Sequence, residues 1–147
     1  MFKINQLFYS PVKSLSFTSV KKLEILDCIG IKFDRNFAFT RDLDDNEINY
    51  VLQNPLKRQI SNFLSLKYFP DLNEYNFDFN NDFLHLKKNN NIILSTDIKN
   101  GAEIRILCDK MQELIPKVKR IRLVNDPMNP FFDTMPSKTI SLINLNS

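Results

Sequence analysis

Short segments of alternating apolar and polar residues, separated by turns rich in asparagine, constrain the fold of this chain most. Tyr75, Phe77 and Phe79 alternate with polar residues, a pattern typical of a strand with one buried face. Asparagine tolerates left-handed backbone better than other non-glycine residues, and the chain contains only 2 glycines. We therefore interpret the asparagine clusters at 80–81 and 89–91 as turns between strands.

Similar apolar segments occur along most of the chain. The expected strands cover residues 3–12, 17–28, 31–40, 50–52, 63–68, 74–79, 82–88, 92–96, 102–108 and 118–124. Residues 41–49 are expected to form a hairpin tip and residues 56–62 a turn of helix. The pair Asn100-Gly101 is a strong signal for a further hairpin turn.

One helix stands out near the end of this series. Asp109 and Gln112 have the spacing of a helix capping box, and Pro116 ends the helical pattern. Many short strands at close spacing, with so little helix, indicate a sheet, sandwich or partly closed barrel. We therefore predict a mainly β fold, antiparallel and β-barrel-like, with one or two short helices.

Length and composition favour one domain. A chain of 147 residues, 43% of them hydrophobic, is long enough to bury one sizeable core. Several prolines after residue 125 indicate a domain over 1–125, followed over 126–147 by a linker. The sequence lacks a run of about 18 apolar residues and a signal-peptide pattern, so we expect a cytoplasmic protein without a membrane span.

Charge and residue types argue against several function classes. The net charge of +3 is mild, and the basic residues of 117–122 lack the interleaved aromatic rings that stack on bases, so no nucleic-acid partner is expected. Cys28 and Cys108 are too few for a disulfide framework or a metal-ligand set, and Cys108 is expected to be a buried thiol. His85 is the only histidine, so we predict no metal site and no catalytic residue.

Lys13, Ser14 and Arg35 are the candidates for binding an anionic, phosphate-bearing ligand. Arg35 shares the parity of Phe33 and Phe37 in an expected strand, and burying an unpaired guanidinium costs several kcal/mol. It therefore needs a carboxylate or a bound anion, and its planar fork suits phosphate. Lys13 adds a charge and Ser14 a hydroxyl at a strand corner. The alternative is that Arg35 pairs with a carboxylate such as Asp34 while Lys13 is solvated.

These residues lie in stretches that resemble a known family. Residues 7–14 (LFYSPVKS) are similar to the strand and Y-P-V-K-S corner of the N-terminal β-barrel domain that precedes the MOSC domain, with Ser10 inserted. Residues 30–35 (GIKFDR) look like that family's glycine turn and D-R motif. Residues 131–141 (FFDTMPSKTIS) resemble the F-x-D-x-x-P-x-x-x-I-S passage that opens the MOSC domain proper. The architecture occurs in the C-terminal region of molybdenum cofactor sulfurase and in the mitochondrial amidoxime-reducing component with its bacterial relatives.

The resemblance implies a function and a set of contacts. In such proteins the lysine and serine of the first motif and the arginine of the second help to hold the molybdenum cofactor (Mo-molybdopterin), which implies this role for Lys13, Ser14 and Arg35. The complete architecture is a molybdenum-dependent oxidoreductase or a cofactor sulfurtransferase. Its MOSC domain supplies the molybdenum-ligating cysteine, which neither Cys28 nor Cys108 matches.

By this resemblance, residues 126–147 are a linker and the truncated start of a MOSC domain. We therefore expect the chain to be inactive alone and to bind cofactor only with a C-terminal MOSC domain or a separate chain as partner. The sequence also departs from the family at 52–55 (LQNP), where a basic residue commonly precedes a glutamate-proline pair.

Two other functions remain open at this point. The chain could be a small β-domain acting as a structural or protein-interaction module, with Arg35 paired internally. It could also be an anion- or RNA-binding barrel, which would require a continuous basic surface joining Lys119, Arg120 and Arg122 to Lys13.

Overall fold

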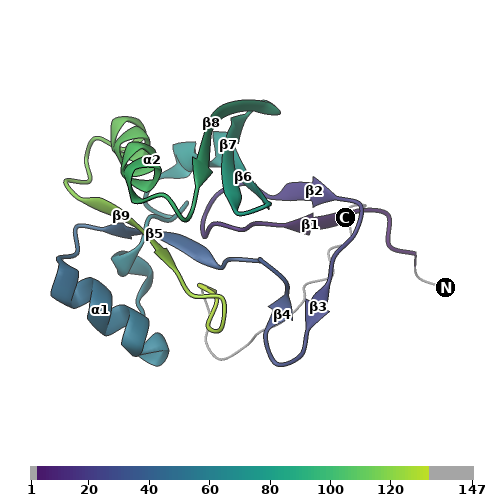
Figure 1. Ribbon diagram of the computed structural model, residues 1–147, viewed down its shortest axis with the longest axis horizontal. Helices are drawn as coiled ribbons and strands as arrows, with labels where there is room; N and C mark the ends of the chain where they lie inside the picture. The colour runs from purple at the N-terminus through teal and green to yellow at the C-terminus, as the bar shows by residue number, and fades with distance from the viewer. Residues whose placement is uncertain (1–2, 133–147) are drawn as a thin grey trace.

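Nine strands and two α-helices make up the part of the chain that the computed structural model describes, residues 3–132 (Figure 1). The strands are β1 (Leu7–Tyr9), β2 (Thr18–Val20), β3 (Ile25–Leu26), β4 (Gly30–Ile31), β5 (Phe37–Arg41), β6 (Tyr75–Asn80), β7 (Phe83–Lys88), β8 (Asn91–Asp97) and β9 (Ile121–Asn125). The helices are α1 (Asp45–Gln53) and α2 (Gly101–Leu114), with 3-10 turns η1 (Pro55–Lys57), η2 (Ile60–Asn62) and η3 (Pro70–Glu74).

The strands form four small antiparallel sheets. β6, β7 and β8 make a three-stranded sheet, and the pairs are β1 with β2, β3 with β4, and β5 with β9. Single parallel bridges, Val12 to Phe37 and Ser16 to Asn76, connect neighbouring sheets. The prediction of a mainly β, antiparallel fold is confirmed, although these sheets do not close into a barrel within residues 3–132.

The meander of β6, β7 and β8 follows from local turn chemistry. The turn from β6 to β7 places Asn81 and Asp82 at φ of 48° and 65°, and the next turn places Asn89 and Asn90 at 52° and 63°. This left-handed conformation is one that Asn and Asp adopt more readily than other non-glycine residues. The predicted asparagine turns and the strands beside them are therefore confirmed.

The prediction of a hairpin tip at 41–49 and a strand at 50–52 is wrong, because this region is helix α1. The Asp44 carboxylate accepts a hydrogen bond from the Glu47 backbone N–H at 2.8 Å, and the Glu47 carboxylate accepts one from the Asp44 N–H at 2.8 Å. This reciprocal capping box satisfies backbone donors at the start of the helix. The acidic residues that suggested a loop are thus the start of a helix.

Helix α2 corrects a second prediction. Asn100-Gly101 does not make a hairpin turn, since the Asn100 side chain caps α2 by accepting from the N–H groups of Ala102 and Glu103 at 3.1 and 3.4 Å. Residues 102–108, expected as a strand, are the first part of this helix, and Asp109 lies within it rather than at its start. Cys108 is therefore not at a helix entry, but it is buried as expected.

Two expected long strands are interrupted. Residues 17–28 contain β2 and β3, and Cys28 lies exposed in the turn before β4 with a φ of 58°. In residues 31–40 only the last part is β5, because Phe33 and Arg35 adopt φ of 67° and 53°. Arg35 therefore does not share a strand face with Phe37. Residues 63–68 form no strand beyond a bridge from Phe63 to Thr40, although the helical turns before them are present as η1 and η2.

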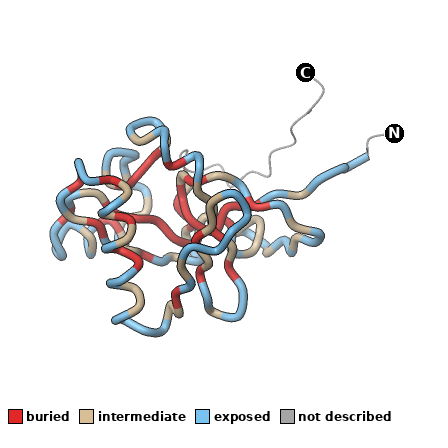
Figure 2. The backbone as a smooth tube through the Cα atoms, turned by 90° about the horizontal axis from the view of Figure 1, so that it is seen from above, coloured by how far each residue is buried: buried red, intermediate tan, exposed pale blue. Residues whose placement is uncertain are grey.

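The core has two parts, and buried segments concentrate in the middle of the molecule (Figure 2). The larger cluster joins β5, β6, β7 and α2, with Phe37, Phe77 and Met111 almost completely buried. The smaller cluster joins α1 to the segment after β9, and Phe131 is 2% exposed within it. Residues 126–132, expected to begin a linker, therefore pack on the fold, while the rest of the passage at 131–141 lies outside the described residues.

Strand β9 begins three residues later than the strand expected at 118–124, but the expected exposure of the basic residues is confirmed. Lys119 and Arg122 are exposed, while Ile121 and Val124 are buried. Within residues 3–132, neither helix has the length and apolar character that crossing a bilayer requires.

Candidate functional site

The candidate site forms where the chain after β1 runs beside the segment before β5. The Arg35 N–H donates to the Ser10 carbonyl at 2.6 Å, and the Phe37 N–H donates to the Pro11 carbonyl at 3.0 Å. The Lys13 N–H in turn donates to the Phe37 carbonyl at 2.8 Å. Backbone hydrogen bonds therefore bring the two sequence motifs, around Lys13 and Arg35, into adjacent positions.

Strand β1, which leads into this site, is held by a buried tyrosine. The Tyr9 hydroxyl donates to the Asp78 carboxylate at 2.9 Å and accepts from the Phe79 N–H at 3.0 Å, so it joins β1 to β6. Burial, together with the neighbouring carboxylate, raises the pKa of Tyr9 above its ordinary value. The phenol therefore stays neutral and acts as a structural hydrogen-bonding group.

The Phe131 peptide connects the same two motifs a second time. Its N–H donates to the Arg35 carbonyl at 2.8 Å, and its carbonyl accepts from the Lys13 ammonium at 3.4 Å. Phe131 is 118 positions from Lys13 in the sequence. Tertiary structure thus places the ends of the stretches at 7–14 and 30–35 beside the start of the stretch at 131.

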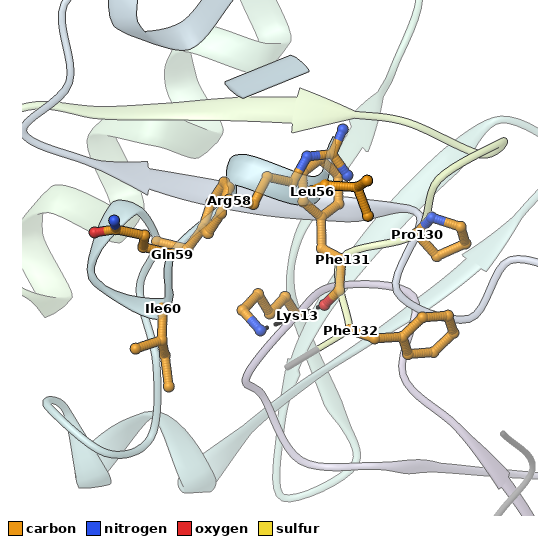
Figure 3. A pocket seen from close by; sticks show the side chains of 9 residues that line it. Lys13, Leu56, Arg58, Gln59, Ile60, Pro130, Phe131 and Phe132 are labelled. Atoms are coloured by element: carbon orange, nitrogen blue, oxygen red, sulfur yellow. Dashed lines mark hydrogen bonds between the residues drawn. The ribbon is translucent and has the colours of Figure 1, made fainter. Parts of the chain in front are cut away.

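Lys13 lies at the edge of a pocket of about 240 Å³ (Figure 3). The lining residues are Lys13, Leu56, Arg58, Gln59, Ile60, Phe63, Pro130, Phe131 and Phe132. Lys13 is only 4% exposed, so the expectation that it could be merely solvated does not describe its environment. A buried ammonium beside a pocket of mixed polar and apolar lining can offer charge and hydrogen-bond donors to an anionic group.

Ser14 forms the corner that follows Lys13. Its φ of 67° lies in the left-handed region, which turns the chain away from the site, and the residue is half-buried. Among the residues the structure describes, the lining of the pocket includes Lys13 but not Ser14 or Arg35. The three candidate residues are therefore close along the backbone without sharing one cavity.

Arg35 has a carboxylate partner. Its Nη1 lies 2.5 Å from Asp34 Oδ2, and the guanidinium stands over the rings of Phe17 and Phe132 at 5.5 and 5.6 Å. The other oxygen of Asp34 accepts from the Ser10 N–H at 2.8 Å. The pairing of Arg35 with Asp34, left open as an alternative by the sequence, is what the structure contains.

The site fits a phosphate group in part. Lys13 supplies a buried cation next to a cavity, and Arg35 forms an ion pair with Asp34. A guanidinium has five N–H donors, and the Asp34 contact uses one of them, with the Arg35 side chain 27% exposed. Arg35 could therefore bind an anion while it keeps its carboxylate, as a second and weaker contact than Lys13.

Arg58 is a residue of this region that the sequence did not indicate. Its Nε donates to the Val51 carbonyl at 2.8 Å and its Nη1 to the Asn129 carbonyl at 2.6 Å. Its Nη2 pairs with the Asp126 carboxylate, and its guanidinium lies 4.4 Å from the centre of the Phe131 ring. No local pattern marks Arg58, because Asp126 is 68 positions away in the sequence.

Asp78, His85 and Ser95 lie side by side but do not form a catalytic centre. Asp78, His85 and Ser95 are cross-strand neighbours on β6, β7 and β8, and His85 Nδ1 lies 2.8 Å from Ser95 Oγ. Asp78, however, bonds Tyr9 and pairs with Lys87, so it does not complete a triad with His85.

The cysteines and carboxylates do not add a metal centre to the described part of the chain. Burial raises the pKa of the Cys108 thiol, and Cys28 is exposed in the turn between β3 and β4. Residues 3–132 contain no group of three or more His, Cys, Asp or Glu arranged to hold a metal ion.

Comparison with known proteins returns no relative for this chain: no family model, no curated protein and no solved structure matches it.

Proposed function

We propose that this chain is the N-terminal module of a MOSC-type molybdenum-cofactor protein, in which Lys13, Ser14 and Arg35 contact the phosphate-bearing end of the cofactor. One observation carries the proposal: the Phe131 backbone accepts a hydrogen bond from the Lys13 ammonium and donates one to the Arg35 carbonyl. The ends of two stretches that resemble one family in sequence thus lie beside the start of the third. A chance resemblance in sequence does not require that its parts meet.

The module would supply one wall of the binding site. Lys13 would provide the main charge at the pocket, Arg35 a second charge outside it, and Ser14 a hydroxyl and a turn. The molybdenum centre of the bound cofactor would supply the redox or sulfur-transfer chemistry. The metal-ligating cysteine would come from a partner domain or chain, since Cys108 is a buried thiol with a raised pKa. The protein would function in the cytoplasm, where both free cysteines stay reduced.

A titration with inorganic pyrophosphate tests the phosphate contact directly. We expect weak, saturable changes in the amide NMR signals of Lys13, Ser14 and Arg35, with an affinity in the millimolar range. Lys13→Met should abolish them, because it removes the buried charge and keeps the chain's length. Lys119→Met is the matched control, since it removes one positive charge from an exposed site on the approach to β9.

Two results would refute the proposal. The first is a set of pyrophosphate-induced changes that Lys13→Met leaves unaltered, since binding would then occur elsewhere. The second concerns the half-site: tight binding of the intact molybdenum cofactor to the chain alone, measured by isothermal titration, would show that no partner domain is needed.

The Arg35 ion pair favours a second candidate function. With its guanidinium paired to Asp34 and close to two phenylalanine rings, Arg35 can serve as a structural group in a protein-interaction module that binds no cofactor. Phe17, at 53% exposure, would then lie on the interaction surface beside it. Absence of any pyrophosphate effect at Lys13 and Arg35 would favour this function over the first.

A further inference from the structure

Phe131 is held from two sides (Figure 3). Its carbonyl faces the Lys13 ammonium, and its ring lies beneath the Arg58 guanidinium at 4.4 Å from Cζ to the ring centre. The ring also packs edge-on against Phe63 at 5.2 Å between centroids. The position of the carbonyl that contacts Lys13 therefore depends on the residue that holds the ring.

Arg58 adds polar contacts between the end of α1 and the segment after β9, which also share the smaller core cluster. On one side it donates to the carbonyls of Val51 and Leu52, at 2.8 and 3.5 Å, in the last turn of α1. These carbonyls lack partners inside a helix, and α1 has no basic residue of its own in that turn. On the other side Arg58 bonds the Asn129 carbonyl and the Asp126 carboxylate, which are in the chain after β9.

The segment that Arg58 holds is further fixed at its start. The Asp126 N–H donates to the Asn36 carbonyl at 2.8 Å, and the other Asp126 oxygen accepts from the Asn129 N–H at 3.0 Å. Asp126 thus shapes the turn from which Phe131 continues. With the Arg58 side chain 7% exposed, this set of contacts is largely shielded from water.

From these contacts we infer that Arg58 is the positioning residue of the pocket. Four of its five donors already serve three carbonyls and Asp126, which leaves it little capacity to bind a ligand. It instead sets the distance between Phe131 and Lys13, and the place of Phe132 against Arg35. The inference rests on the proposed function only for the identity of the ligand. Lysine could not replace Arg58. A guanidinium directs donors to carbonyls on one side and to a carboxylate on the other, whereas a single ammonium cannot reach both sides.

Arg58→Lys in the full chain tests the inference, because it keeps the charge and removes the fork. The first readout is the rate at which an acylating reagent modifies Lys13, followed by mass spectrometry below the unfolding transition. We expect this rate to rise about tenfold, as the loss of one charge-assisted hydrogen bond would allow. Lys110, whose side chain is 36% exposed and lies far from this segment in the sequence, should react at an unchanged rate.

A core variant separates positioning from stability. Leu72 lies in the larger hydrophobic cluster, away from Phe131. Leu72→Ala should therefore lower the free energy of unfolding without changing the rate of Lys13 acylation below the unfolding transition. Asp126→Asn, which weakens the same set of contacts from the other partner, should reproduce the effect of Arg58→Lys in milder form.

The second readout is the affinity for inorganic pyrophosphate, which should fall in Arg58→Lys and not in Leu72→Ala. An unchanged rate of Lys13 acylation in Arg58→Lys, or an equal rise in Leu72→Ala, overturns the inference. If the wild-type chain binds no pyrophosphate but Arg58→Lys still raises the rate, the proposed ligand is wrong and the role of Arg58 in placing Phe131 against Lys13 is supported.

Discussion

Two arginine–aspartate pairs flank the same segment of this protein, and they differ in sequence separation, in the number of acceptors and in exposure to solvent. Arg35 pairs with its neighbour in sequence, makes one contact to a carboxylate, and has a side chain that is 27% exposed. Arg58 pairs with a residue 68 positions away, also bonds three carbonyls, and is 7% exposed. Phe131 and Phe132 lie between them, one ring against each guanidinium.

The difference shows how burial and the number of acceptors assign roles to identical side chains. A guanidinium whose donors are distributed over several buried acceptors stabilises the fold and has little left for a ligand. One that makes a single contact at the surface keeps donors that a bound anion can use. The following substitutions test this comparison, beginning with the largest expected effect.

Arg58→Met should lower the free energy of unfolding by about 3–5 kcal/mol, the range for a buried ion pair that loses one partner. The physical reason is that Asp126 loses its ion-pair partner and keeps only a backbone N–H as donor, while three carbonyls lose the Arg58 donors at the same time. Urea denaturation followed by circular dichroism measures the loss. Arg120→Met is the control, since its pair with Asp45 is exposed and should cost less than about 1 kcal/mol. Equal losses of unfolding free energy in the two variants would show that the buried ion pair contributes no more than the exposed one.

Arg35→Met should cost about 1.5–3 kcal/mol, the range for a hydrogen bond to a charged group. Asp34 keeps the Ser10 N–H as a donor after the substitution, so it is not left without a partner. The same urea titration measures the change, and the stacking of the methionine between Phe17 and Phe132 should limit it. A loss larger than that of Arg58→Met would reverse the comparison.

Ser14→Val should lower the free energy of unfolding by about 1–2 kcal/mol, because a β-branched residue fits poorly at a φ of 67°. Ser14→Gly has no such strain and should stay within about 1 kcal/mol of the wild type. Thermal unfolding of the pair isolates the backbone effect at this corner. If glycine and valine behaved alike, the left-handed conformation at Ser14 would not be important for stability.

The smallest expected effect is that of salt on the stability contributed by the two ion pairs. Raising the ionic strength from about 0.1 M to about 1 M shortens the Debye length from about 10 Å to about 3 Å, which screens exposed charges more than buried ones. The stability difference between wild type and Arg35→Met should therefore narrow, while that for Arg58→Met should stay nearly constant. A parallel decline for both variants would mean that the Arg58 pair is as open to solvent as the other.

The sequence predicted some parts of the fold and missed others whose signals it contains. The β6–β8 meander was predictable because strand alternation and asparagine turns act over a few residues. The capping box of Asp44 and Glu47 is equally local, but a cluster of acidic residues favoured a loop over a helix. Asn100 was similarly ambiguous, since an Asn-Gly pair suits a hairpin turn as well as the start of a helix.

The candidate site, too, was predictable from the sequence only in part. Lys13, Ser14 and Arg35 could be named from the sequence, and so could the pairing of Arg35 with Asp34, because the partners are adjacent or belong to short motifs. The face on which Arg35 lies could not be predicted, since left-handed residues at 33 and 35 break the parity of the strand. The pocket beside Lys13 could not be predicted either, because its lining comes from three separate regions of the chain.

By itself, then, the sequence determined the mainly β class, the turns of the meander and the chemical identity of the candidate residues. These follow from backbone preferences and contacts within a few positions. Only the tertiary structure decided that Lys13 is buried and that Arg58 holds the segment which reaches it. The reason is physical: burial and long-range ion pairs depend on which distant segments pack together, and no local pattern encodes a contact across 68 or 118 positions.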